Sequence, residues 1–335
     1  MRRVLRWAVR GVLFVLVGAS VALAVFRWQA ARRETQSAAA AAPRGGRFVR
    51  AADVDVFVQE AGPAEAQALV FVHGTGAWSE TWRPTMNATS AAGFRAVAMD
   101  LPPFGYSQRP AAPRYGKRDQ GRRIVGVLDA LGIREAVLVG HSFGGGPTVE
   151  AALLAPGRVR ALVLVDAALS IRSEAGAAPQ PSPLLSGLLA VEPLRDAVVA
   201  TFLSNPRFTR RLLQSFIADP AAATDERVAV YQRPLSVEGT TRAFGQWLPA
   251  LLVPSEPFPS ESPGSYATLG VPVSVIWGDR DTITPLAQGQ RLASLVPGSR
   301  LVILAGVGHI PQIEAPEKFN EALLGVLGGP NRSGS

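Results

Sequence analysis

The segment that most constrains this chain is 136–148, which reads A-V-L-V-G-H-S-F-G-G-G-P-T. A run of apolar, strand-forming residues, 136–139, leads into a G-x-S-x-G pattern centred on Ser142. In a nucleophile elbow of this kind, a strand turns sharply into a helix and presents the serine at the apex. Glycine is needed two positions before and after the serine, because the strained turn leaves no room for larger side chains. The segment therefore predicts a strand-turn-helix unit with Ser142 available for chemistry.

Short apolar runs separated by turn residues surround this segment. Runs typical of strands occupy residues 54–58, 69–72, 96–99, 137–139, 162–165, 271–277 and 300–304. Segments able to form helices lie between them, at residues 78–92, 119–131, 144–154, 286–295 and 316–327. Strands and helices that alternate in this way predict an α/β fold, with a mostly parallel sheet covered by helices on both faces.

The alternation stops after Asp166. Residues 171–265 are rich in Pro, Ser, Leu and Phe, and the helices expected there are 184–203, 209–217 and 240–252. A helical block inserted between two halves of one sheet is the simplest arrangement. The expected domains are an α/β core at 47–170 and 266–330, a helical lid at 171–265 and a disordered tail at 331–335.

The N-terminal segment 1–28 has the composition of a membrane-targeting helix. Four arginines precede Gly11–Phe26, a run of 16 residues without charge. As a helix this run spans roughly 24 Å, which is short for a bilayer core of about 30 Å, but Trp7 and Trp28 bracket it like interfacial aromatic residues. We expect an uncleaved transmembrane anchor. The alternative is a signal peptide cleaved near residues 22–24, which read A-L-A.

The expected location of the protein follows from this segment. A single N-terminal span places the folded domain outside the cytoplasm, because the arginine distribution weakly favours a cytoplasmic N-terminus. If the segment is cleaved, the protein is exported in soluble form. Residues 29–46 are polar and then Ala-rich, so they are expected to form a flexible linker with little capacity for a core.

Charge and composition exclude several classes of function. The net charge is +8, but residues 1–50 hold ten arginines and one acidic residue, so the rest of the chain is close to neutral. A nucleic-acid partner is not expected, since it would require basic residues gathered on a domain face. The chain has no cysteine and three histidines, His73, His141 and His309, so neither a metal site nor a cofactor is expected.

Two loops downstream of Ser142 carry groups that could activate it. Serine needs a base, an orienting acid and donors for the developing oxyanion. The first loop, 277–285, reads W-G-D-R-D-T-I-T-P after a predicted strand, and the second ends at His309 after the next strand. His309 is the candidate base. His73 closes an upstream strand, and the pleat directs the side chain of His141 away from Ser142.

Four blocks of the sequence resemble the α/β-hydrolase fold superfamily, in particular its serine-nucleophile esterases, C–C bond hydrolases and cofactor-free haloperoxidases. The blocks are H-G-T-G at 73–76, D-L-P-P-F-G-Y-S at 100–107, the serine motif, and the acid and histidine loops. The resemblance covers residues 47–328 and implies the α/β-hydrolase fold. It also implies a catalytic triad of Ser142, Asp281 and His309.

The identity of the acid stays open at this point. Asp281 fits the family's G-x-x-D-x-x-x-P pattern, whereas Asp279 and Asp166 are alternatives, the latter at a position used by some family members. The resemblance also implies that the oxyanion hole consists of the backbone N–H groups of Thr75 and Phe143.

A serine nucleophile implies an acyl-enzyme, and hence a substrate with a carbonyl group. The leading hypothesis is a carboxylic ester hydrolase. The same triad also suits a C–C bond, amide or thioester hydrolase or a cofactor-free perhydrolase, and a non-catalytic ligand-binding protein on this fold is a third interpretation. Apolar residues in the predicted lid favour a small, hydrophobic, ester-like substrate.

Overall fold

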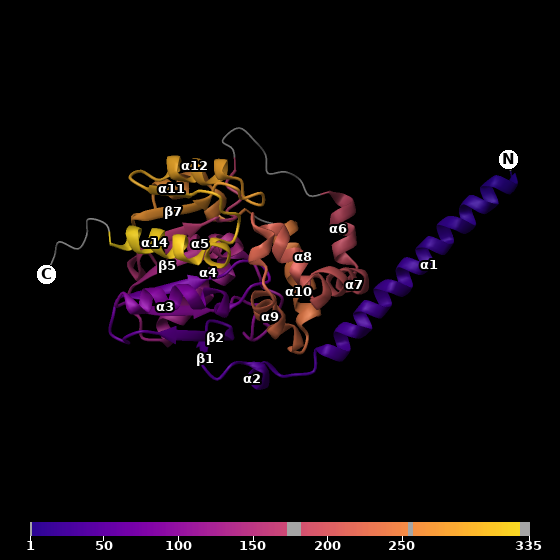
Figure 1. Ribbon diagram of the computed structural model, residues 1–335, viewed down its shortest axis with the longest axis horizontal. Coiled ribbons are helices and arrows are strands. Elements are labelled where there is room, and N and C mark those ends of the chain that lie inside the picture. The colour runs from indigo at the N-terminus through magenta and orange to yellow at the C-terminus, as the bar shows by residue number, and fades with distance from the viewer. Residues whose placement is uncertain (1, 173–181, 254–256, 329–335) are drawn as a thin grey trace.

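The computed structural model describes residues 2–172, 182–253 and 257–328. An eight-stranded, mostly parallel sheet lies between two layers of helices, so the predicted fold class is confirmed (Figure 1). The tail predicted at 331–335 lies outside the described residues, as do two parts of the predicted lid, 173–181 and 254–256.

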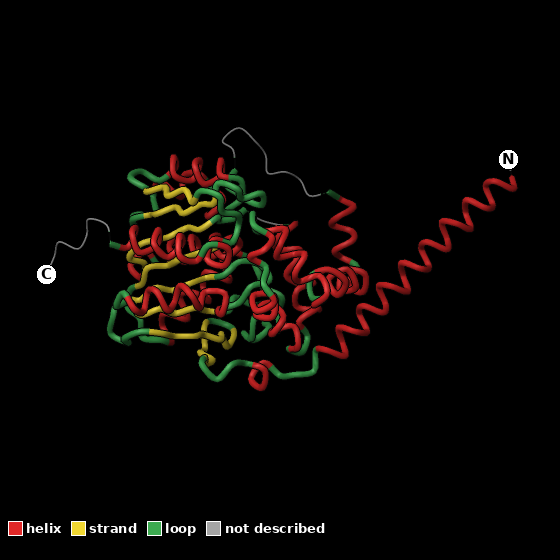
Figure 2. The backbone as a smooth tube through the Cα atoms, in the orientation of Figure 1, coloured by secondary structure: helices red, strands yellow, loops and turns green. Residues whose placement is uncertain are grey.

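The strand order in the sheet is β1-β2-β4-β3-β5-β6-β7-β8. The strands are β1 (Gly46–Ala51), β2 (Val54–Ala61), β3 (Ala68–Val72), β4 (Arg95–Met99), β5 (Ala136–His141), β6 (Val159–Val165), β7 (Val273–Gly278) and β8 (Arg300–Leu304). β1 and β2 are antiparallel to their neighbours, and β3 to β8 are mutually parallel. Figure 2 shows the strands in yellow between the red helices. The loops after the parallel strands therefore meet at one edge of the sheet.

Alternate side chains of the central strands pack against opposite helix layers, because strand side chains point to the two faces in turn. Val70 and Val72 of β3 belong to the core shared with α4 (Lys117–Ala130), α5 (Gly145–Leu154) and α12 (Leu286–Leu295). Leu69 and Phe71 belong to the core on the other face, with α3 (Arg83–Ala91) and α14 (Pro316–Leu327). Burial on both faces explains why these strands read as nearly continuous apolar runs.

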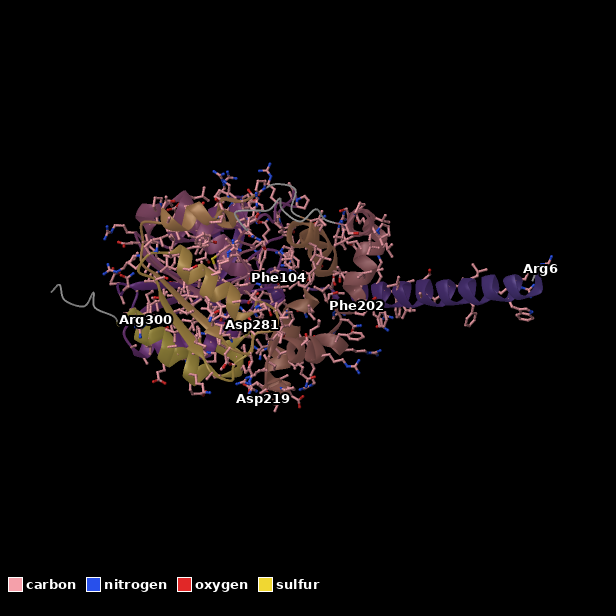
Figure 3. The ribbon with its side chains drawn as sticks, turned by 90° about the horizontal axis from the view of Figure 1, so that it is seen from above. Arg6, Phe104, Phe202, Asp219, Asp281 and Arg300 are labelled. Atoms are coloured by element: carbon pink, nitrogen blue, oxygen red, sulfur yellow. The ribbon has the colours of Figure 1, made fainter. Side chains whose placement is uncertain are left out.

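A series of helices is inserted between β6 and β7. They are α6 (Pro183–Ala190), α7 (Glu192–Phe202), α8 (Pro206–Phe216), α9 (Asp225–Gln232), α10 (Thr240–Leu252) and α11 (Pro263–Ala267). All but the last gather at one end of the sheet, whereas α11 lies beside α12 (Figures 1 and 3). We call the helices α6 to α10 the lid. The helix predicted at 184–203 is divided at Val191, which lies between α6 and α7, and Pro193 stands in the first turn of α7. α9 was not predicted.

Shorter helical turns complete the described chain. They are α2 (Ala38–Ala41), α13 (Pro311–Glu314) and the 3₁₀ turns η1 (Ser79–Trp82), η2 (Ser142–Gly144), η3 (Pro156–Arg158), η4 (Pro220–Ala222), η5 (Arg233–Ser236) and η6 (Pro259–Glu261). Two of them, η2 and α13, lie beside the residues predicted to carry the chemistry.

The predicted membrane span is wrong. α1 (Arg2–Arg33) is one continuous helix that projects from the body of the molecule (Figure 1). Within the part of the chain that the structure describes, no helix combines the length and the apolar character needed to cross a bilayer. Arg10 and Arg27 bound the uncharged run, which as a helix spans about 24 Å against a bilayer core of about 30 Å. The membrane is therefore withdrawn as a partner. The location inferred from this segment is withdrawn as well, both for an anchored and for an exported protein.

The interval 29–46, expected to be a flexible linker, contains the last turn of α1 and the short helix α2. It contacts the lid at several points. The carboxylate of Glu34 accepts hydrogen bonds from the backbone N–H of Thr241 at 3.1 Å and from its hydroxyl group. Arg33 donates to the carbonyl oxygen of Leu235 at 3.1 Å, and Gln36 forms a parallel bridge with Val237. These contacts join the N-terminal segment to the start of α10.

Replacing Glu34 by alanine is expected to destabilise the protein by about 1 kcal/mol, because the N–H of Thr241 in the first turn of α10 loses its acceptor. Urea denaturation measures this change. The matched control is Glu238→Ala, which removes an exposed carboxylate next to the same helix start. Equal stability of the two variants would contradict the contact.

Candidate active site

The turn after β5 holds Ser142 in a strained conformation. Ser142 opens η2 with a φ of +51°, a left-handed value that residues other than glycine rarely adopt. The neighbouring glycines make the turn possible. A Cβ on Gly144 would lie 2.5 Å from the carbonyl oxygen of His73, and one on Gly140 would lie 2.5 Å from Oγ1 of Thr148.

Three loops at the carboxyl edge of the sheet bring Ser142, His309 and Asp281 together. Nε2 of His309 lies 2.8 Å from Oγ of Ser142, and Nδ1 lies 2.8 Å from Oδ2 of Asp281. All three side chains are buried. Because a carboxylate only accepts, Nδ1 carries a proton and Nε2 is available to accept the serine proton. In this arrangement an imidazole can act as general base toward a serine hydroxyl.

Four hydrogen bonds fix the carboxylate of Asp281. Its Oδ1 accepts from the backbone N–H groups of Ile283 at 2.7 Å and Thr284 at 2.9 Å. Its Oδ2 accepts from His309 and from the hydroxyl of Thr284 at 2.5 Å. Burial by itself would raise the pKa of Asp281, but the hydrogen bond and charge of His309, with the bonds from Thr284, outweigh burial and hold the pKa below its ordinary value. Asp281 is therefore ionised at neutral pH.

The two alternative acids make other contacts. Asp279 is exposed and accepts a hydrogen bond from the N–H of Gly306 at 2.7 Å. Asp166 is fully buried at the end of β6, where it accepts from the N–H of Gly278 at 2.9 Å, and burial raises its pKa well above the ordinary value. Of the three candidates, Asp281 is the one that the structure brings within hydrogen-bonding distance of His309.

His73 and His141 are buried beside the site in defined tautomers. Nε2 of His73 accepts from the N–H of Leu101 at 2.9 Å, so its Nδ1 is protonated and donates to the carbonyl oxygen of Gly74 at 2.8 Å. Nε2 of His141 donates to the carbonyl oxygen of His309 at 2.7 Å. Burial lowers the pKa of His73 to about 4 and that of His141 to about 3, so both rings are neutral at neutral pH.

Of the two predicted oxyanion donors, Phe143 directly follows Ser142 in the chain, and Thr75 lies in the loop that faces Ser142. Phe143 is the second residue of η2, and the first N–H groups of a helical turn have no acceptor within it. Thr75 follows Gly74 in the loop after β3. A Cβ on Gly74 would lie 2.7 Å from Cβ and 3.2 Å from Oγ of Ser142, so this loop passes directly against the serine.

Aromatic side chains join the sheet to the lid next to Ser142. Phe143 packs edge-on against Trp247 of α10, with ring centroids 5.4 Å apart. Phe104, labelled in Figure 3, contacts Trp247 at 4.9 Å and Phe244 at 5.0 Å. The ring of Phe216, at the end of α8, lies 5.7 Å from that of His309. These contacts give the site an apolar boundary that includes the lid.

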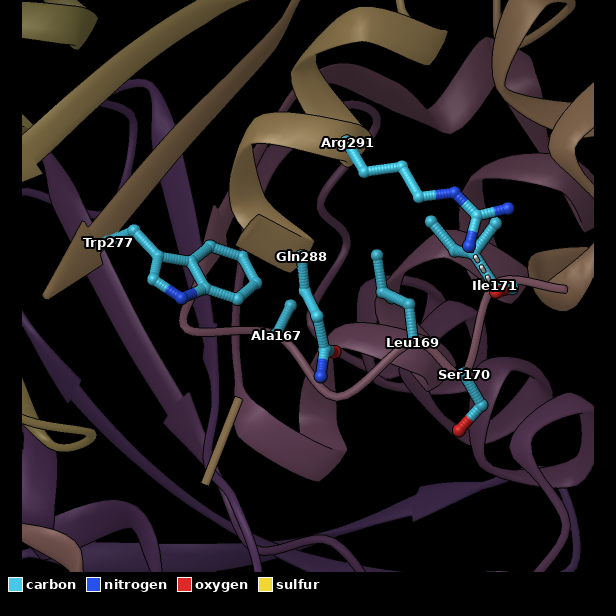
Figure 4. A pocket seen from close by; sticks show the side chains of 7 residues that line it. All are labelled: Ala167, Leu169, Ser170, Ile171, Trp277, Gln288 and Arg291. Carbon is cyan, nitrogen blue, oxygen red and sulfur yellow. Dashed lines mark hydrogen bonds between the residues drawn. The ribbon is translucent and has the colours of Figure 1, made fainter. Parts of the chain in front are cut away.

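A separate cavity of about 280 Å³ lies between the end of β6 and α12 (Figure 4). Its lining residues are Ala167, Leu169, Ser170, Ile171, Trp277, Gln288 and Arg291. The guanidinium of Arg291 donates to the carbonyl oxygens of Ile171, at 3.0 Å, and Arg172. Its charge is thus engaged with backbone, and none of the three predicted triad residues lines this cavity.

Two groups that contact the site were not found from sequence. Thr284 lies three residues after Asp281 in a loop. The Asp-x-x-Thr spacing is the only feature of the sequence that could have indicated its contact with Asp281, and it is a weak one. Glu314 accepts hydrogen bonds from the backbone N–H groups of Gly308 and Asp219, both at 2.8 Å. No motif indicated Glu314, because one of its partners is distant in the chain.

A family model described as the alpha/beta hydrolase fold matches residues 67–316. The chain belongs to this family. It is an α/β hydrolase, and the superfamily resemblance inferred from its motifs is confirmed. The described residues that match include the elbow, the acid loop and His309.

Several hydrolases of known name are similar to this chain. It is 32% identical over 283 residues to a 2-hydroxymuconate semialdehyde hydrolase from a Pseudomonas species, covering 83% of this chain and 92% of the relative. It is 30% identical over 278 residues to a 2-hydroxy-6-oxo-2,4-heptadienoate hydrolase from Pseudomonas putida, covering 82% and 93%. A solved meta-cleavage product hydrolase from Pseudomonas fluorescens IP01 superposes with a TM-score of 0.66 at 27% identity, covering 84% and 97%. All three of these relatives are named as hydrolases.

Adding one methyl group at Gly74 is expected to inactivate the site. The Cβ of Gly74→Ala would overlap Ser142 at 2.7 Å and must displace the serine or the loop. We expect the rate of Ser142 labelling by a fluorophosphonate probe to fall by about a hundredfold or more, as expected for a misplaced reacting group. Gly157→Ala is the control, because its Cβ meets open space. An unchanged rate in Gly74→Ala would contradict the position of this loop.

His73 should make stability depend on pH. Its pKa is depressed from 6.5 to about 4 by burial, so the unfolded chain binds the proton first and the stability that neutral His73 contributes is lost as the pH falls from about 6.5 to 4. Wild type should lose up to about 1.4 kcal/mol per pH unit relative to His73→Asn across this range. Urea denaturation at pH 7, 6 and 5 measures the difference. If the free energy of unfolding changes with pH in the same way in wild type and in His73→Asn, the pKa of His73 is not depressed in the folded protein.

Proposed function

We propose that this protein is a serine-dependent C–C bond hydrolase that acts on a 2-hydroxy-6-oxodienoate. The supporting observation is the hydrogen-bonded series Ser142, His309 and Asp281 in a chain 32% identical, over most of its length, to a 2-hydroxymuconate semialdehyde hydrolase. The carboxylic ester hypothesis, which the motifs alone put first, shares the triad but lacks support from these relatives.

The chemistry of such a substrate determines which bond breaks. A ketone or aldehyde has no alkoxide to expel, so attack on its carbonyl carbon must release a carbon leaving group. In the 2-oxo tautomer, carbon 5 is a saturated carbon attached to the double bond between carbons 3 and 4, which is conjugated with the carbonyl at carbon 2. The electron pair released when the bond between carbons 5 and 6 breaks is therefore delocalised onto that oxygen. No other bond to carbon 6 has this stabilisation.

The residues of the site have matching roles in the proposed reaction. Oγ of Ser142 attacks carbon 6 while Nε2 of His309 takes its proton, and Asp281 stabilises the imidazolium. The N–H groups of Thr75 and Phe143 would hold the tetrahedral oxyanion. The imidazolium then returns the proton to the dienolate. The acyl group left on Ser142 is hydrolysed by water, which His309 deprotonates.

A substrate comparison tests the reaction class. We expect kcat/KM for 2-hydroxy-6-oxo-2,4-heptadienoate to exceed that for p-nitrophenyl acetate by at least about tenfold, equal to about 1.4 kcal/mol of transition-state stabilisation. Loss of the dienoate absorbance and release of p-nitrophenolate are measured on one enzyme preparation. The reverse ratio would make the protein a carboxylic ester hydrolase.

Removal of the nucleophile tests the proposed triad. Ser142→Ala should lower kcat for the preferred substrate by about 10⁴-fold or more, because no acyl-enzyme can form. Ser294→Ala, which removes an exposed hydroxyl on α12, should react like wild type. Circular dichroism confirms that both variants are folded. Full activity in folded Ser142→Ala would rule out the acyl-enzyme mechanism.

A further inference from the structure

The end of lid helix α8 lies directly against the loop that carries His309. The carbonyl oxygen of Phe216 accepts a hydrogen bond from the backbone N–H of His309 at 2.8 Å. The preceding residue, Gly308, is so close to the lid that a Cβ on it would lie 2.5 Å from the backbone nitrogen of Ala218. The lid therefore contacts the main chain of the candidate base itself.

An apolar cluster supports the same junction. Leu213 and Ile217, from α8 and its end, pack with Ile310 and Ile313, which follow His309. All four side chains are buried. The hydrophobic contact is formed between the lid and α13, so movement of either part would expose apolar surface on both.

Glu314, the last residue of α13, completes the junction with its carboxylate. Oε1 accepts from the N–H of Asp219 in the lid at 2.8 Å, and Oε2 accepts from the N–H of Gly308 in the histidine loop at 2.8 Å. The two donors belong to segments far apart in the sequence. One carboxylate accepts both bonds because each of its two oxygens is an acceptor.

The other side of His309 is held by the elbow. The carbonyl oxygen of His309 accepts from Nε2 of His141, which directly precedes Ser142. The backbone of His309 is thus bonded to the lid through its N–H and to the elbow through its carbonyl oxygen. The distance between Nε2 of His309 and Oγ of Ser142 depends on both attachments.

We propose that Glu314 is a positioning residue that couples the lid to His309. It keeps the histidine loop in register with the lid segment 216–219, so that correct seating of the lid is a condition for proton transfer from Ser142. The inference rests on the proposed function of Ser142 and His309. Beyond that function, it assigns the lid a second role: the lid positions His309 as well as forming a wall of the substrate site.

Glu314→Gln tests this role with little change in shape. The amide has one acceptor oxygen, so one of the two backbone N–H groups loses its bond and faces an NH₂ group. We expect labelling of Ser142 by a fluorophosphonate to slow by about tenfold, because small displacements of a reacting group are costly. Glu317→Gln, an exposed glutamate on the next helix, is the matched control and should label at the wild-type rate.

Two probes separate this role from a merely structural one. A short-chain fluorophosphonate can react with Ser142 without contacting the lid. The alkyl chain of a long-chain probe contacts the lid as well. If Glu314 positions His309, both probes react more slowly with Glu314→Gln in protein that circular dichroism shows to be folded. Slowing with the long-chain probe alone would mean that Glu314 only shapes the substrate site, and would overturn the proposal.

The remaining outcomes are also decisive. Wild-type rates in Glu314→Gln with both probes would overturn the proposal. If Glu314→Gln does not fold, Glu314→Asp replaces it: its shorter side chain keeps the charge but cannot reach both N–H groups, and a wild-type rate in that variant would overturn the proposal. If wild-type protein itself is not labelled at Ser142, the proposed function fails, which is distinguishable from failure of the role of Glu314.

Discussion

The hydrogen bond between Oγ of Ser142 and Nε2 of His309 is the interaction on which the rest of the site depends. It joins a strained turn to a loop that follows another strand, and both ends must be held within a fraction of an ångström to be useful. The strain at Ser142 is supported by glycines that allow neighbouring backbone to approach. The opposite end is supported by Asp281, whose carboxylate is fixed by the backbone and hydroxyl of Thr284. The geometry is thus maintained from several directions.

The helices of the lid contribute to this geometry, although they are inserted far from the serine in the sequence. Trp247 packs on Phe143, beside the nucleophile, and the end of α8 holds the main chain of His309. The N-terminal segment in turn contacts α10 through Glu34. Contacts therefore run continuously from α1 through the lid to the candidate base. If Glu314 couples the lid to the histidine loop as proposed, a substrate that shifts the lid also displaces His309.

The fold and the triad candidates could be predicted because their signals are local. The glycines around Ser142, the apolar strand runs and the G-x-x-D-x-x-x-P pattern of Asp281 each lie within a few residues of one another. β1 was missed because Gly46–Ala51 reads G-R-F-V-R-A, in which two adjacent apolar residues between arginines show neither an apolar run nor a period-two alternation. The site contacts of Glu314 could not be predicted, since one of them joins residues 95 positions apart and the other belongs to no motif. The membrane prediction failed because it relied on Trp7 and Trp28 to extend an uncharged run of 16 residues, which as a helix spans roughly 24 Å against a bilayer core of about 30 Å.

The proposed mechanism requires that His309 activate Ser142 as a nucleophile. Its most direct test is peptide mass spectrometry of the full-length protein after reaction with a fluorophosphonate, beside the variant His309→Gln. We expect a single adduct on Ser142 in wild type and almost none in folded His309→Gln. An unmodified Ser142 in wild type, or an equal rate of modification in the variant, would contradict it.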